Sequence, residues 1–130
     1  MRTYQQLVQA LLRIDRDRLH IGELTNQVLE EEDISENQLA TRLAQDLPPR
    51  SDGIKRGYLQ QCRSLTFAAP ELQAAYQRDD FDWGALRGLF RTFGDKYQHD
   101  HDAERVALAN ALEVQTRLGR RLRERETKDL

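Results

Sequence analysis

The amino-acid sequence predicts an all-α protein, a compact bundle of six or seven helices that ends in a basic C-terminal helix. Apolar residues recur every three or four positions along most of the chain, and several segments open on helix-capping patterns. No segment alternates apolar and polar residues as a strand does. Hydrophobic residues make up 38% of the 130 residues, which suffices for one core. We therefore expect residues 1–130 to form a single helical domain, with 116–130 as a basic helical tail.

Three helices are expected before residue 48. The first begins at Thr3, an N-cap with Gln6 three residues later, and Gly22 separates it from a short second helix. Ser35 and Gln38 form another capping box, which opens the third helix. The apolar residues expected to face the core are Tyr4, Leu7, Val8, Leu11 and Ile14 in the first helix, Leu24, Val28 and Leu29 in the second, and Leu39, Ala40, Leu43 and Leu47 in the third.

The remaining helices follow a proline-containing loop at 48–53, where two residues lack a backbone donor. A fourth helix comes directly after this loop, and Pro70 suits the first turn of a fifth. Asp82 is the expected N-cap of the next helix, and a final helix runs from about Asp102 towards Arg125. The inward residues expected for the fourth helix are Ile54, Tyr58, Leu59, Cys62 and Leu65, and those for the fifth are Leu72, Ala75 and Tyr76. The helix capped by Asp82 is expected to bury Trp83, Leu86, Phe90, Phe93 and Tyr97. The final helix is expected to bury Val106, Ala109, Leu112 and Leu118.

Charge is distributed unevenly along the chain, although the net charge is only −2. The stretch 23–36 is acidic and contains neither lysine nor arginine, whereas 117–128 is strongly basic. A second basic set consists of Arg50, Lys55, Arg56 and Arg63. The run Glu30–Asp33 lies at a helix C-terminus, where negative charge opposes the helix dipole, so it serves a partner or a salt-bridge network. Segregated charge of this kind determines partners rather than fold.

The sequence also indicates the cellular compartment of the protein. No run of about 18 apolar residues is present, so no membrane span is expected. The first residues lack the apolar core of a signal peptide. Cys62 is the only cysteine, which excludes an internal disulfide. We therefore expect a cytoplasmic protein.

Catalytic and metal-binding motifs are scarce. His99 and His101, with Asp100 and Asp102, are the only candidate metal ligands, and a polar loop that caps a helix explains the same residues. The sequence has no glycine-rich phosphate loop, no nucleophile elbow and no nearby Cys–His pair. Glu30 to Glu32 fit a solvated helix end better than an acid–base site. We expect no enzyme activity, no metal and no cofactor.

Part of the chain resembles the helix-turn-helix region of ParB-type partition proteins. The stretch 35–65, the sequence Arg-Ser-Leu-Thr-Phe-Ala-Ala-Pro-Glu-Leu-Gln-Ala-Ala-Tyr from Arg63, and Asp-Trp-Gly-Ala-Leu-Arg from Asp82 carry this resemblance. It implies DNA binding, with Arg56, Tyr58 and Gln61 facing the groove. The segment 48–53 departs from the family, because it makes the turn longer than that motif allows.

The whole chain resembles the small helical subunits of CRISPR effector complexes. The likeness lies in its length, its helical make-up, its divided charge, and the basic segments Arg87-Gly-Leu-Phe-Arg91 and 117–125. It implies a non-catalytic subunit that lines a filament and helps to hold nucleic-acid strands.

Both resemblances imply nucleic-acid contact without catalysis. We therefore expect a non-catalytic subunit that contacts the phosphate backbone within a larger nucleoprotein assembly, because guanidinium groups match phosphate oxygens. The residues expected to contact nucleic acid are Arg50, Lys55, Arg56, Arg63, Arg87, Arg91, Arg117, Arg120, Arg121, Arg123 and Arg125. The alternatives are a ParB-like DNA-binding protein, or a protein-interaction module whose acidic and basic ends pair with other subunits or with a second copy.

Overall fold

The computed structural model describes residues 2–48, 56–90 and 96–127, and all its elements of regular secondary structure in these ranges are α-helices. Six of its helices have seven or more residues and no strand is present in the described ranges, which confirms the predicted fold class. The chain divides into two compact units, Met1–Thr66 and Phe67–Leu130, each described by itself below. The single domain expected for 1–130 stays a prediction. No helix in the described ranges is long and apolar enough to span a membrane.

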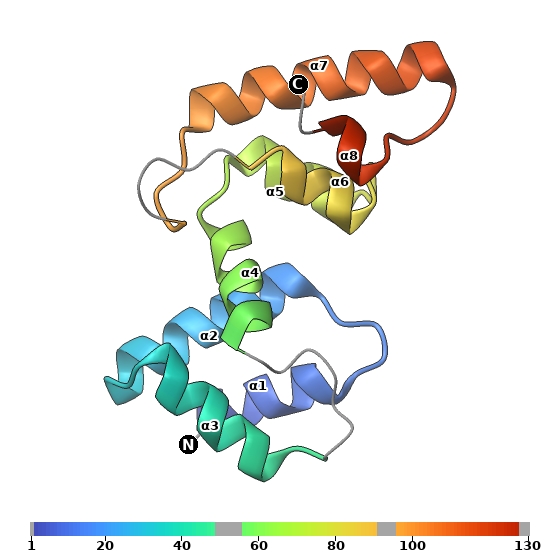
Figure 1. The fold of residues 1–130 in the computed structure, drawn as a ribbon. Coiled ribbons are helices and arrows are strands. Elements are labelled where there is room, and N and C mark those ends of the chain that lie inside the picture. Colours follow the sequence, from blue (N-terminus) through green and yellow to red (C-terminus); the bar gives the residue numbers. More distant parts are fainter. Residues whose placement is uncertain (1, 49–55, 91–95, 128–130) are drawn as a thin grey trace. The chain divides into compact units, whose positions relative to one another are not determined.

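The first unit consists of α1 (Arg2–Leu12), α2 (Arg18–Glu32), α3 (Glu36–Asp46) and α4 (Arg56–Thr66) (Figure 1). The capping box of α3 is present as predicted, because the Ser35 hydroxyl accepts from the Gln38 N–H and the Gln38 side chain accepts from the Ser35 N–H. Asp17, which the sequence did not single out, caps α2 through its carboxylate. Thr3 already lies inside α1 and is buried, so the prediction that it caps this helix is wrong.

Gly22 lies inside α2 rather than between two helices, so the predicted interruption is wrong. Helix α2 packs against α4 at this residue. A Cβ atom at Gly22 would lie 2.1 Å from the Cys62 carbonyl oxygen and 2.8 Å from Thr66 Cγ2. The absence of a side chain therefore lets the two helix backbones approach one another.

The core of the first unit contains most of the residues predicted for it. Its buried members are Tyr4, Leu7, Leu11, Ile21, Leu24, Val28, Leu39, Leu43, Leu47, Leu59 and Cys62. Ile14 is fully exposed, contrary to the prediction, because α1 ends at Leu12 and Ile14 falls in the following loop. Ile54 lies outside the described residues.

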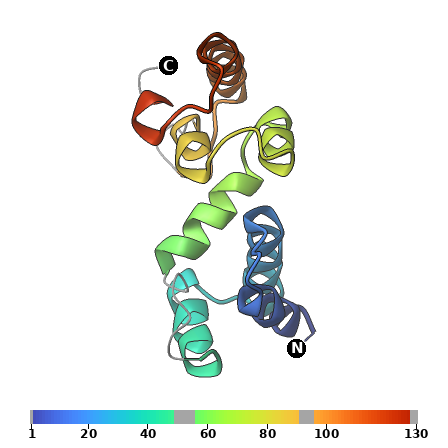
Figure 2. The same ribbon diagram turned by 90° about the vertical axis from the view of Figure 1, so that its right-hand side faces the viewer.

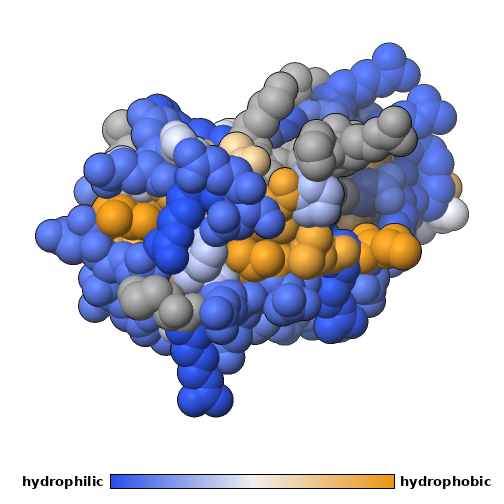
Figure 3. Space-filling model, turned by 90° about the horizontal axis from the view of Figure 1, so that it is seen from below, coloured by the Kyte–Doolittle hydropathy of each residue, from blue (hydrophilic) through white to orange (hydrophobic). Residues whose placement is uncertain are grey.

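The surface seen in Figure 3 is mainly hydrophilic and carries a band of apolar side chains.

The second unit consists of α5 (Pro70–Gln77), α6 (Trp83–Gly88), α7 (His101–Leu118) and α8 (Glu124–Thr127) (Figures 1 and 2). Pro70 occupies the first position of α5, as predicted. Helix α6 ends much earlier than the predicted aromatic stripe, and Phe93 lies outside the described residues. Trp83 is only half-buried, and its ring meets the rings of Tyr76 and Phe90 edge-on, with centroids 6.1 and 6.0 Å away.

Helix α7 presents a different face to the core from the predicted one. Its buried residues are Glu104, Ala107, Leu108 and Ala111, whereas Val106, Ala109, Leu112 and Leu118 are exposed. A fully buried carboxylate explains this rotation, because Glu104 Oε1 accepts from the backbone N–H of Ala69 at 2.9 Å. The helix also ends at Leu118, before Gly119 with φ 67°, so it does not continue towards Arg125 as predicted.

Candidate nucleic-acid interface

The basic C-terminal segment, residues 117–127, folds back onto its own unit. Leu122 and Thr127 are buried, and the Leu122 N–H donates to the Gln115 side chain at 3.0 Å. Helix α8 packs on α6 where that helix carries two glycines, Gly84 and Gly88. The segment expected to form a basic helical tail therefore packs against its unit, because its apolar residues require burial and the glycines leave room for them.

Two of the predicted arginines hold this segment in place. Arg120 forms two parallel hydrogen bonds with the Glu126 carboxylate, at 2.9 and 3.1 Å. Hydrogen bonds from the Arg120 guanidinium lower the pKa of Glu126 to about 2, and the backbone N–H of Arg123 contributes. Arg121 bridges Asp82 and Asp79, at 2.9 and 3.0 Å. These carboxylates occupy the hydrogen-bonding groups that a phosphate would otherwise take.

Three arginines of the same segment have no such partner in the ranges that the structure describes. Arg117 lies in the last turn of α7, Arg123 precedes α8 and Arg125 lies within it. All three are exposed, and none forms an ion pair with another residue in the part of the chain that the structure describes. Among the described residues, no carboxylate occupies these three guanidinium groups.

The other predicted basic residues are engaged or lie outside the described ranges. Arg87 pairs with Glu124 at 2.9 Å, and Arg56 donates to an asparagine side chain. Arg63 is mostly buried and pairs with Glu36 at 2.9 Å. Arg50, Lys55 and Arg91 lie outside the described residues.

Tyr58, a groove-facing residue by the ParB resemblance, is half-buried in the first unit. The guanidinium carbons of Arg16 and Arg18 lie 5.5 and 5.9 Å from its ring centroid. Burial raises the pKa of its hydroxyl. Tyr58 therefore contributes to packing within its own unit.

Part of the acidic run also serves an internal network, one of its two expected roles. Glu32 pairs with Arg42 at 2.5 Å, and the Arg42 guanidinium lies over the Tyr4 ring, 3.7 Å from its centroid. The Tyr4 hydroxyl donates to Asp46 at 2.6 Å, and burial together with this contact raises its pKa. Glu30 remains exposed.

An open groove of about 1040 Å³ on the first unit was not predicted from the sequence. It is lined by Arg2, Tyr4, Gln5, Gln6, Val8, Gln9, Ala10, Arg13, His20, Arg42 and Asp46. Arg13 pairs with Asp15, and Arg42 with Glu32. Arg2 is the lining arginine without an ion pair among the described residues, so the groove offers fewer available guanidinium groups than the C-terminal segment.

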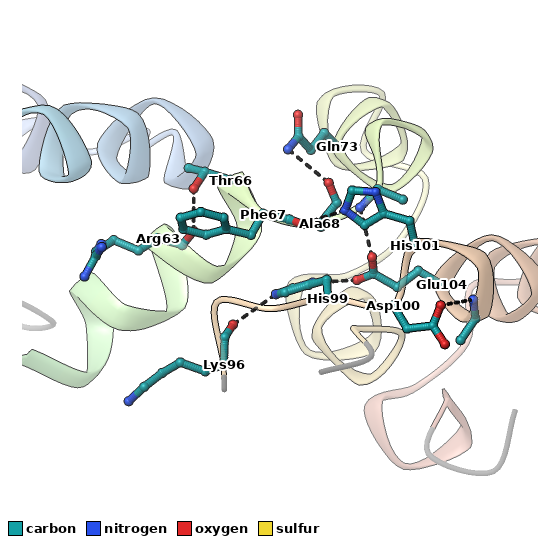
Figure 4. A network of polar contacts seen from close by, with 12 residues as sticks. Arg63, Thr66, Phe67, Ala68, Gln73, Lys96, His99, Asp100, His101 and Glu104 are labelled. Atoms are coloured by element: carbon teal, nitrogen blue, oxygen red, sulfur yellow. Dashed lines mark hydrogen bonds and ion pairs between the residues drawn. The ribbon is translucent and has the colours of Figure 1, made fainter. Parts of the chain in front are cut away.

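His99 and His101 take part in a polar network that ties the start of α7 to the residues before α5 (Figure 4). His99 Nδ1 lies 2.7 Å from Glu104 Oε2, and both side chains are fully buried. His99 Nε2 lies 3.0 Å from the Lys96 carbonyl oxygen, so acceptors face both ring nitrogens. His101 Nε2 lies 2.9 Å from the Phe67 carbonyl oxygen.

Asp100 completes this network by accepting from the Ala103 N–H, as the helix-capping interpretation of the motif predicts. Among the described residues, no group of three or more His, Cys, Asp or Glu side chains is arranged to hold a metal ion. These contacts thus give His99, Asp100 and His101 a structural role in the fold.

The chain matches no protein-family model, no curated protein and no solved structure.

Proposed function

We propose that this chain is a non-catalytic helical module that binds the phosphate backbone of nucleic acid within a larger assembly. The observation that carries the proposal is the group of three exposed arginines, Arg117, Arg123 and Arg125, without ion pairs among the described residues. The resemblance to the small helical subunits of CRISPR effector complexes agrees with such a role.

The arginines of the C-terminal segment 117–127 fall into two groups with different roles. Arg120 and Arg121 are neutralised by carboxylates and fix the backbone from 119 to 127 against the unit. The remaining three arginines offer planar guanidinium groups, which match phosphate oxygens. Contacts of this kind position a protein on nucleic acid without reading its sequence. We therefore expect binding with little sequence preference.

The test compares two double variants that change the net charge equally. Arg123→Gln with Arg125→Gln removes two arginines of the proposed interface. Arg13→Gln with Arg78→Gln removes two exposed arginines that pair with the neighbouring Asp15 and Asp80. Affinity for single- and double-stranded oligonucleotides is measured by fluorescence anisotropy as a function of salt.

Only the first double variant is expected to bind clearly more weakly. Each lost duplex contact lowers the slope of log affinity against log salt by about 0.9, and each lost single-strand contact by about 0.7. Two lost contacts thus predict a decrease of about 1.8 for duplex. Equal losses in both variants would show that only net charge matters. Absence of binding by the native chain at about 50 mM salt, where screening is weak, would refute the proposal.

A protein-interaction module is a second candidate, favoured by one specific observation. Helix α7 directs three apolar residues, Val106, Ala109 and Leu112, away from its own core.

A further inference from the structure

The outward face of α7 carries an apolar stripe, defined by Val106, Ala109 and Leu112. The exposed fraction is 62% for Val106 and 36% for Leu112, and Ala109 is also exposed. The spacing of three residues keeps all three on one side of the helix. Because the opposite side holds the buried residues of α7, this stripe contributes nothing to the described core.

The residues around this stripe are symmetric about Ala109. Val106 and Leu112 lie three residues before and after it, and Arg105 and Glu113 lie four residues before and after it. Each apolar residue thus has an apolar counterpart across the centre, and the positive charge has a negative counterpart. A surface that must match itself under a two-fold rotation requires this pattern.

We propose that two copies of this chain associate through α7, with the helices antiparallel and the two-fold axis at Ala109. Val106 of one copy then packs against Leu112 of the other, and Arg105 faces Glu113. The small side chain of Ala109 permits close approach at the axis. A parallel arrangement would instead place Glu113 against Glu113. The antiparallel pair gives Glu113 a guanidinium nitrogen of Arg105, whose charge Glu71 and Asp102 already offset, so the antiparallel pair is favoured.

Arg105 is already oriented for such a contact. Its Nε donates to Glu71 and its Nη1 donates to Asp102 at 3.0 Å, which restricts the motion of the guanidinium. Its Nη2 has no hydrogen-bond partner among the described residues, and 45% of the side chain is exposed. Holding the group in advance reduces the entropy lost when a carboxylate from the second copy binds.

The association is expected to be weak, because each copy contributes only three apolar residues to the centre of the interface. A dissociation constant on the order of 100 µM is reasonable for a small interface of this kind. This proposal does not depend on nucleic-acid binding, because the stripe does not include the arginines assigned to that function.

The first test uses two neighbouring exposed positions of α7. Ala109→Arg places two positive charges together at the axis, whereas Asn110→Arg adds the same charge about 100° around the helix. Sedimentation equilibrium of the full chain, from about 10 to 500 µM around the expected constant, should show dimers of the native protein and of Asn110→Arg. Ala109→Arg should associate at least about tenfold more weakly, a difference of about 1.4 kcal/mol.

The second test establishes the orientation of the helices. Arg105→Glu alone and Glu113→Arg alone should each weaken the dimer, and the two substitutions together should restore it. An equimolar mixture of the two single variants should form heterodimers, because opposite charges then face each other at both contacts. Circular dichroism verifies that each variant remains folded.

A native protein that stays monomeric up to about 500 µM, well above the expected constant, would overturn the proposal. Equal association of Ala109→Arg and Asn110→Arg would overturn it as well. A folded double charge-swap variant as weak as the single variants would refute the antiparallel arrangement.

Discussion

Replacing Gly22 by alanine tests the packing of α2 against α4 most directly. The added Cβ would lie 2.1 Å from the Cys62 carbonyl oxygen and 2.6 Å from its carbonyl carbon. Ordinary contacts of a Cβ atom begin near 3.4 Å, so the helices must separate by about 1 Å. The obstacle is helix backbone, which cannot move aside by changing a rotamer.

The expected cost follows from the core on both sides of this contact. Ile21, Val28, Leu59, Cys62 and Leu65 are all fully buried in α2 and α4. A gap of about 1 Å removes up to half of the dispersion energy of atoms that face it, and overpacking typically costs about 1–3 kcal/mol. Alanine recovers at most about 1 kcal/mol through its higher helix propensity. With an overpacking cost near the upper end, Gly22→Ala should be destabilised by about 2 kcal/mol.

The assay is urea denaturation followed by circular dichroism, with Gly57→Ala as the matched control. Gly57 lies in the first turn of α4, and no atom lies within 4 Å of the position that its Cβ would occupy. That variant should be unchanged or stabilised by up to about 1 kcal/mol. If Gly22→Ala proved as stable as the native protein, the close approach of α2 and α4 would be wrong.

Three further predictions concern buried and paired groups. Burial raises the pKa of the Cys62 thiol to about 12, so a thiol reagent at pH 8 should modify it only as fast as the protein unfolds. Glu104→Ala should cost about 1–3 kcal/mol in thermal or urea unfolding for each buried group that loses its partner, namely the Ala69 N–H and the His99 ring, and Glu104→Gln, which keeps an oxygen acceptor, should cost less. The pKa of Glu126 is lowered from 4.5 to about 2, so its stabilising effect is complete above pH 4.5 and lost as pH falls through about 2. Carbon-13 NMR titration should show this, and Arg120→Gln should move the pKa back towards 4.5, whereas an unchanged pKa would contradict the pairing.

Much of the helical structure was determined by residues close together in the sequence. The capping box of Ser35 and Gln38 was predictable because both partners lie within one turn. Pro70 likewise marks the start of α5 through its own backbone geometry. The apolar spacing of Leu39 and Leu43 correctly indicated the buried face of α3. Such signals are local, so they can be interpreted without knowledge of the fold.

Whether each arginine of the candidate interface is paired with a carboxylate was not predictable from such local signals. The sequence shows that 117–125 is basic, but not which arginines are neutralised. Arg121 pairs with residues 39 and 42 positions earlier in the chain, at Asp82 and Asp79. Only the return of the C-terminal segment to α6 brings these charges together and leaves Arg123 and Arg125 exposed.

The sequence by itself thus determined the all-α class and several helix starts. Tertiary contacts decided which face of each helix is buried and which charged side chains are paired. Gly22 can equally end a helix or admit a neighbouring backbone, and its packing against α4 determines which. The stripe of Val106 and Leu112 satisfies helical periodicity, yet the buried Glu104 turns it outward. A buried carboxylate must satisfy its hydrogen bonds, and the cost of leaving it unpaired exceeds the gain from burying one or two further apolar side chains.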